Sequence, residues 1–307
     1  MTKTNYGYCC INLELGKQKV TTNRGMVKRT FQAKGIAYAS ELALQNVRDL
    51  ARIINWNHNN GVKLYRMSSD IMPWMSEYEF KDLPDYERIK NILIGCGKIA
   101  KLHGQRLTFH PGHFNVLASL NESVVVKTIK ELNQHGEFMD LLDMPRTPYA
   151  AINIHVNTTQ GGKEEAAKRF CANFALLDDS VKTRLVLEND DKCAQYAVED
   201  LFSNVYLNTG VPITFDYHHH WCHPGSLTQE EALKLAATTW PEGIKQLCHY
   251  SSAKCVYEDE AVMNRAHADF IYEKINDHGL DLDIELEAKA KEQAWNRYMK
   301  QFAFELV

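Results

Sequence analysis

Apolar residues along the chain fall into short runs that alternate with longer stretches of helical spacing. Short runs that are followed directly by polar residues are typical of strands buried in a parallel sheet. Residues 184–187 are the clearest example, because Glu188, Asn189, Asp190 and Asp191 follow at once. On this pattern we predict eight strands, at residues 6–13, 62–67, 106–109, 150–154, 184–187, 212–215, 245–248 and 280–286.

The segments between these runs favour helices. The first helix is expected after the N-cap Ser40 and should stop at Asn59-Asn60-Gly61. The others are expected at residues 89–102, 124–142, 163–176, 198–207, 228–239 and 288–304. Residues 20–35 are polar and basic without periodicity, and we interpret them as a long loop, either solvated or in contact with phosphates.

Strands that alternate with helices in this way are typical of the α/β class and of a (β/α)₈ barrel, also called a TIM barrel. No linker rich in Pro or Ser divides the chain, so we expect residues 1–307 to form a single domain.

Imidazole or carboxylate side chains follow six of the predicted strands. They are His110, His155, Glu188, Asp216 with His219, His249 and Glu287. All strands of a barrel point the same way, so these side chains should meet at the face where barrel enzymes carry their chemistry. Any one histidine could instead be a packed or surface residue. The whole set favours a metal cluster, and its donors suit Zn²⁺, Mn²⁺ or Fe²⁺. His218 and His220 should point away from His219 if the segment is extended.

The composition of the chain says less about its function than the residues that follow the predicted strands. The net charge of −4 does not by itself indicate a nucleic-acid binder, although bound metal ions can supply a local positive field. The eight cysteines include no C-x-x-C pair, and the polar N-terminus lacks a signal peptide. No apolar run is long enough for a membrane span. We therefore expect a protein of the cytoplasm or nucleus that is neither secreted nor bound to a membrane.

Nine short motifs occur in order along nearly the whole chain. They are WNxxNG (56–61), YRMSS (65–69), FHPG (109–112), NIH (153–155), LENDDK (187–192), FDxHH (215–219), HYSS (249–252), HAD (267–269) and EAKAKE (287–292). As an ordered set they resemble the UV damage endonuclease family. The resemblance implies a metal-dependent (β/α)₈ barrel similar to endonuclease IV and xylose isomerase. It also implies a DNA repair enzyme that nicks the strand 5′ to cyclobutane pyrimidine dimers and 6-4 photoproducts, in an alternative route of excision repair.

The resemblance also assigns residues and partners. The implied metal ligands are Glu77, His110, His155, Glu188, Asp216, His219, His249, His267 and Glu287, with Glu188, His249 and Glu287 catalytic. Tyr8, Asn12, His113 and Phe114 match positions that contact the lesion or the DNA. The implied cofactor is two or three divalent ions, with Mn²⁺ expected and Zn²⁺ or Mg²⁺ as alternatives. The implied partner is UV-damaged double-stranded DNA, bound by a monomer.

Three positions depart from the family pattern. Glu77 stands where the family has a histidine ligand, and His113 stands where it has a glutamine. Leu247 replaces a lysine that is modified in the family, and Lys245 on the same strand face should lie deeper by about 7 Å. The alternatives are an abasic-site endonuclease or a sugar isomerase on the same barrel, or a damage-binding protein with impaired catalysis.

Overall fold

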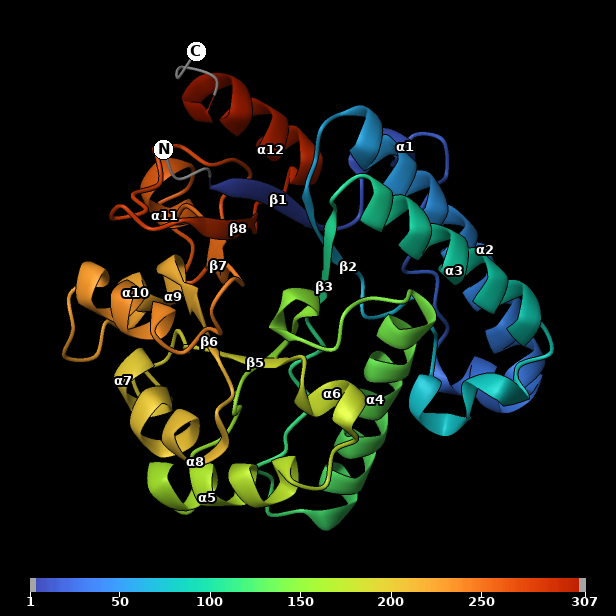
Figure 1. Ribbon diagram of the computed structural model, residues 1–307, viewed down its shortest axis with the longest axis horizontal. Coiled ribbons are helices and arrows are strands. Elements are labelled where there is room, and N and C mark those ends of the chain that lie inside the picture. The colour runs from blue at the N-terminus through green and yellow to red at the C-terminus, as the bar shows by residue number, and fades with distance from the viewer. Residues whose placement is uncertain (1–3, 304–307) are drawn as a thin grey trace.

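The strands close into a parallel barrel in the order β1 to β8, and helices surround it (Figure 1). The structure is a computed structural model that describes residues 4–303. The strands are β1 (Asn5–Cys10), β2 (Leu64–Met67), β3 (Arg106–Phe109), β4 (Ile152–Ile154), β5 (Leu185–Glu188), β6 (Ile213–Asp216), β7 (Gln246–Tyr250) and β8 (Leu282–Leu286). The predicted (β/α)₈ barrel is confirmed.

Long helices cover one side of the barrel, and shorter ones cover the other (Figure 1). They are α1 (Leu13–Gly16), α2 (Lys28–Asn59), α3 (Tyr86–Leu102), α4 (Glu122–Leu141), α5 (Lys163–Phe174), α6 (Asp179–Lys182), α7 (Val198–Leu201), α8 (Leu207–Thr209), α9 (Tyr217–Cys222), α10 (Gln229–Ala237), α11 (Lys254–Tyr257) and α12 (Lys291–Tyr298). Short 3₁₀ or π turns complete the set: η1 (Met75–Glu77), η2 (Phe80–Asp82), η3 (Pro148–Ala150), η4 (Phe202–Tyr206) and η5 (Met299–Ala303). None of the helices in residues 4–303 has both the length and the apolar character needed to cross a membrane.

Three expectations about local structure were wrong. The stretch predicted as a loop already contains the start of α2 at Lys28, and Gly35, at φ 65° and ψ −161°, interrupts the helix and hides its periodicity. The histidine-rich segment is not extended but forms α9, because the Asp216 side chain caps it by accepting a hydrogen bond from the His219 N–H at 2.6 Å. The last helix begins at Lys291, three residues later than expected.

An apolar layer, which we call the apolar floor, crosses the barrel interior below its C-terminal mouth. It is made of Leu64, Ala151, Val186 and Leu247, all fully buried, with Trp240 packed against it. Each of these four residues, of which Ala151 directly precedes β4, lies two positions before a polar side chain closer to the mouth: Arg66, Asn153, Glu188 and His249. Alternation along the strands therefore produces a hydrophobic layer with a polar layer above it.

A buried ion pair lies in the barrel interior beside the apolar floor, in register with Leu64 and Leu247. The Arg106 guanidinium donates to Asp283 at 2.9 Å and to the carbonyl oxygens of Lys245, Pro148 and Tyr149. Arg106 is 2% exposed and Asp283 4%. The multiple hydrogen bonds satisfy a charge that would otherwise be costly to bury.

Candidate metal centre

Glu188 lies at the centre of the mouth, with four imidazole rings around its carboxylate. Its Oε2 is 3.0 Å from His110 Nε2, 3.0 Å from His249 Nδ1 and 3.6 Å from His155 Nε2. Its Oε1 is 3.1 Å from His219 Nδ1. Glu188 is 1% exposed, so this is a buried carboxylate enclosed by nitrogen ligands from β7, from α9 and from the residues that follow β3 and β4.

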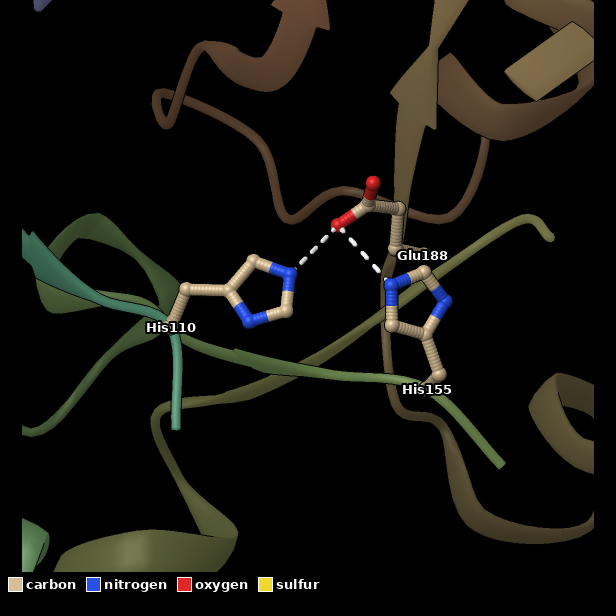
Figure 2. A group of neighbouring side chains, drawn as sticks. All are labelled: His110, His155 and Glu188. Carbon is tan, nitrogen blue, oxygen red and sulfur yellow. Dashed lines mark hydrogen bonds and ion pairs between the residues drawn. The ribbon is translucent and has the colours of Figure 1, made fainter. Parts of the chain in front are cut away.

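Two overlapping groups in this cluster could hold a divalent metal ion. One is His110, His155 and Glu188, and the other is Glu188, Asp216 and His249; in each, one ligand atom per residue lies within 4.8 Å of the others. Figure 2 shows the first group, with both histidine rings turned toward the same carboxylate oxygen. Because Glu188 belongs to both groups, it could bridge two adjacent ions.

Asp216 provides a direct test of whether these residues suit a metal. Its Oδ1 accepts a hydrogen bond from the His219 N–H, but its Oδ2 is buried without a hydrogen-bond partner. A buried unpaired carboxylate oxygen is costly, and a cation beside it would remove that cost. The donor set of imidazole nitrogens and carboxylate oxygens matches ions such as Zn²⁺, Mn²⁺ and Fe²⁺. The residues therefore suit a divalent metal.

Charges inside the cluster keep its carboxylates ionised. Burial alone would raise the pKa of Glu188, but the positive charges of His249 and His155 outweigh it and hold that pKa well below the usual range. Burial likewise opposes ionisation of Glu287, and the Arg66 guanidinium overcomes it and lowers the pKa of that carboxyl. Both acids are thus anionic and ready to bind a cation.

Four interior side chains support the ligands and were not identified from the sequence. Glu285 lies 3.1 Å from His249 Nε2 and accepts a hydrogen bond from Thr108, and both residues are fully buried. Arg66 pairs with Glu287 and lies 3.6 Å from Glu285, while Asn153 donates to Glu188. Glu285, Thr108 and Asn153 each stand two residues before a predicted site residue, so counting back by two would have found these three, whereas no predicted site residue follows Arg66 in this way.

One further contact orients a ligand from outside: His155 Nδ1 lies 3.0 Å from Asp190, while its Nε2 faces Glu188. Partners of this kind fix the ring of a metal-binding histidine. In His219 the nitrogen that faces Glu188, Nδ1, also lies 2.9 Å from the Asn189 carbonyl oxygen. The implied ligand His267 also approaches the cluster, with its Nδ1 3.0 Å from the Glu287 carbonyl oxygen and 3.6 Å from Glu287 Oε2.

Glu77 is not brought into this cluster. It lies in η1, its side chain is 39% exposed, and its carboxylate pairs with Lys127 at 3.4 Å. Neither of the two metal-type groups found in residues 4–303 includes Glu77. Ligation by Glu77 stays a prediction that requires η1 to move toward the mouth.

The structure also locates the two residues of β7 that bear on the missing lysine. Leu247 is part of the apolar floor, directly below His249. Lys245 lies toward the opposite end of the barrel, where its Nζ is 2.7 Å from Asp281. In this arrangement Lys245 does not reach the cluster, in agreement with its expected depth.

The residues implied to contact DNA occupy very different environments. Tyr8 is fully buried and its hydroxyl donates to Asn57 at 2.7 Å, while Asn12 is 2% exposed and caps α1 by accepting from the Leu15 N–H. His113 and Phe114 are exposed beside His110. Only the second pair lies on the surface, so the contact of Tyr8 and Asn12 with DNA stays a prediction.

Gly112 fixes the position of Phe114. A Cβ atom at Gly112 would lie 2.5 Å from Cε1 of the Phe114 ring, closer than any real contact. The ring, which is 60% exposed, therefore lies over the glycine backbone at the edge of the mouth. An exposed aromatic ring held in this way is well suited to contact a ligand that enters the site.

Comparison with known proteins identifies a family and several relatives of this chain. The family model described as UV-endonuclease UvdE matches residues 4–307. The chain is 35% identical to the UV-damage endonuclease of Schizosaccharomyces pombe over 298 residues, which cover 94% of this chain and 49% of that protein. It is 30% identical to a putative UV-damage endonuclease of Acanthamoeba polyphaga mimivirus, with 97% of this chain and 92% of that protein covered. The chain thus spans about half the length of its fungal relative and nearly all of the viral one.

A solved structure agrees with these relatives. The crystal structure of SacUVDE superposes with a TM-score of 0.84 at 27% sequence identity, and the match covers 97% of each chain. The likeness therefore includes the whole barrel with the elements around its mouth.

Proposed function

From the premise that the chain belongs to the UV-endonuclease UvdE family, we propose that it is a metal-dependent endonuclease that nicks DNA 5′ to UV photoproducts. The substrate would be double-stranded DNA carrying cyclobutane pyrimidine dimers or 6-4 photoproducts. The protein would act as a monomer in the cytoplasm or nucleus, in excision repair.

The observation that supports this function best is the Glu188 carboxylate with its four imidazole neighbours. Two or three divalent ions, with Mn²⁺ as the first candidate, would be held by His110, His155, Glu188, Asp216, His219, His249, His267 and Glu287. Glu188, His249 and Glu287 would lie closest to the reacting phosphate. Bound divalent ions supply a water of lowered pKa and a clamp on phosphodiester oxygens.

The protein's own side chains would prepare the mouth for this reaction. Asp190 and Glu285 hold the rings of His155 and His249 in fixed orientations, which reduces the reorganisation needed when substrate arrives. His113 and Phe114 at the rim would recognise the damaged bases, at a cost of unstacking that a distorted lesion lowers. His113 offers ring nitrogens where a hydrogen-bonding residue is expected.

Incision of a defined substrate tests the proposal. The full chain is incubated with a duplex that carries one thymine dimer, in parallel reactions with Mn²⁺, Zn²⁺ and Mg²⁺, and the strands are resolved at nucleotide resolution. We expect a single nick immediately 5′ to the dimer and no nick in the undamaged duplex. Failure to incise with every metal, or incision of an abasic duplex alone, would contradict the proposal.

Glu188→Gln tests the central residue. The amide keeps the shape of the side chain but removes the charge that the ions require, so incision should fall by at least about 10³-fold, as for loss of a central catalytic group. Glu230→Gln, on the exposed face of α10, is the matched control and should incise normally. Full activity of Glu188→Gln would remove Glu188 from the mechanism.

A further inference from the structure

A second concave site lies beside the metal centre and is not used by the chemistry described above. It is a pocket of about 240 Å³ between α9, the end of β7 and α11. His218, on its wall, directly precedes His219, and its ring lies edge-on to His267 with the centroids 5.3 Å apart. The pocket is therefore separated from the metal cluster by a single layer of imidazole rings.

The rim of this pocket is aromatic and accessible. Trp221 is 51% exposed and stacks on His218 at an interplanar angle of 16°. Tyr257 is 44% exposed and stacks on Tyr272 at 4°. Each ring is supported from behind by another ring and still presents surface to a ligand, which is the arrangement of an aromatic platform for planar groups.

The polar lining shows which planar group the pocket would accept. Its lining residues include Glu273 and no lysine or arginine. The Glu273 carboxylate is held by the hydroxyl groups of Tyr250 at 2.6 Å and Ser252 at 2.9 Å. A fixed negative charge without a nearby cation in the lining repels a phosphate, so the pocket favours an uncharged ring.

Two buried polar atoms in the lining have no hydrogen-bond partner among the described residues. They are Oγ of Ser251 and Nε2 of His218, and these residues are 4% and 3% exposed. Buried polar atoms are almost always paired, and an unpaired one requires an explanation. A ligand with hydrogen-bonding edges would pair both atoms, and a hydrocarbon would not.

We propose that this pocket binds one nucleobase of the DNA strand beside the cleaved phosphodiester. The base would stack on Trp221 and form hydrogen bonds with Ser251 and His218. The inference rests on the proposed function, because it takes DNA as the substrate. It adds a base-binding subsite that would hold a nucleotide near the metal cluster and help to fix the position of the scissile phosphate.

Binding by the metal-free full chain tests the subsite without any need for turnover. Affinities are measured for a duplex with one thymine dimer and for an undamaged single strand, each with 2-aminopurine placed in turn at successive positions near the cleavage site. We expect the fluorescence to change at one position only. Trp221→Ala should weaken binding roughly 5- to 100-fold and abolish that change, as for loss of one base–aromatic stack. Trp221→Phe, which keeps an aromatic ring at this position, should retain most of the affinity and most of the fluorescence change.

Ser251→Ala tests the hydrogen bond and should weaken binding roughly 2- to 10-fold. Leu207→Ala, in α8 and 66% exposed, is the control and should bind as the parent does. Parent-like affinity and fluorescence in Trp221→Ala would overturn the subsite, whether or not the protein incises DNA. A loss of binding in Trp221→Ala without incision by the parent would support the subsite and contradict the proposed reaction. A pocket that binds aromatic peptides and no nucleotide would also overturn it.

Discussion

The Tyr8 hydroxyl donates to Asn57 and accepts from Asn12, and all three residues are almost completely buried. This network joins β1 to α2 and to the cap of α1, so it holds the first βα unit together. A role in DNA contact would require the network to open. Tyr8 is therefore a residue at which stability and DNA binding can be measured separately.

Tyr8→Phe should lower the free energy of unfolding by about 1–3 kcal/mol, because Asn57 would lose its partner in a buried site. Urea denaturation measures this loss, and the half-buried Tyr206 provides a control through Tyr206→Phe, which should change stability little. If Tyr8→Phe weakens lesion binding without changing the free energy of unfolding, the Tyr8 hydroxyl contributes to DNA binding and its hydrogen bond with Asn57 does not contribute to stability.

Gly112→Ala should disturb the rim without disturbing the fold. The new methyl group would displace the Phe114 ring, which contributes little to the core because it is exposed. We expect Tm to stay within about 2 °C of the parent value and affinity for a dimer-containing duplex to fall several-fold. Phe114→Ala should show the same loss, and a double variant should lose no more than either single variant. Additive losses would show that Gly112 acts independently of Phe114.

At the scale of elements, the sequence predicts the strands best, because a buried parallel strand is a continuous apolar run whose end is marked by polar residues. His110, directly after β3, and Glu188, at the end of β5, were predicted in this way. Other features depend on contacts that a linear pattern does not show. α9 forms because Asp216 caps it, Gly35 conceals the first turns of α2, and Glu285 lies inside a run whose neighbours are apolar. The exposure of Glu77 is likewise a result of tertiary structure.

The position of α4 depends on a neutral histidine. His135 is 2% exposed, its ring packs edge-on against Phe109, and its Nδ1 lies 2.9 Å from the Glu131 carbonyl oxygen. Burial lowers the pKa of His135 to about 4 from 6.5. The unfolded chain therefore binds a proton at this residue between pH 6.5 and 4 and the folded chain does not, so stability falls as the pH is lowered through that range.

The full effect is on the order of 3 kcal/mol, from about 1.4 kcal/mol for each unit of pKa. His135→Gln should reduce the dependence of the unfolding free energy on pH below 6.5, whatever it does to stability at pH 7. Urea unfolding at pH 7, 6 and 5 measures the slope, and His113→Gln, at the exposed rim, should leave it unchanged. An identical slope in His135→Gln would exclude His135 as its source.

At the scale of the whole molecule, the barrel interior holds two charged regions. The cluster around Glu188 lies above the apolar floor, and the Arg106–Asp283 pair lies in register with the floor residues Leu64 and Leu247. Among the hydrogen bonds and ion pairs of the described residues, none joins Arg106 or Asp283 to the cluster, so changes in one region should have little effect on the other.

Arg106→Met provides the test. It leaves Asp283 buried without its ion-pair partner and should destabilise the protein by about 3–5 kcal/mol. The rise in Tm on addition of Mn²⁺ should nevertheless match that of the parent, whereas Glu188→Gln should lose it. Arg88→Met, which removes an exposed pair with Asp85, should cost less than about 1 kcal/mol. A reduced Mn²⁺ response in Arg106→Met would show that the two regions are coupled.

The apolar floor also limits the proton paths along the barrel axis. Its four aliphatic residues offer no donor or acceptor side chains, so a path from the opposite end must follow β3 and β8, where Thr108 donates to Glu285. The mouth is the other route, and a bound duplex would cover it. While the duplex is bound, the contact between Thr108 and Glu285 would be the connection that remains between the cluster and the opposite end of the barrel.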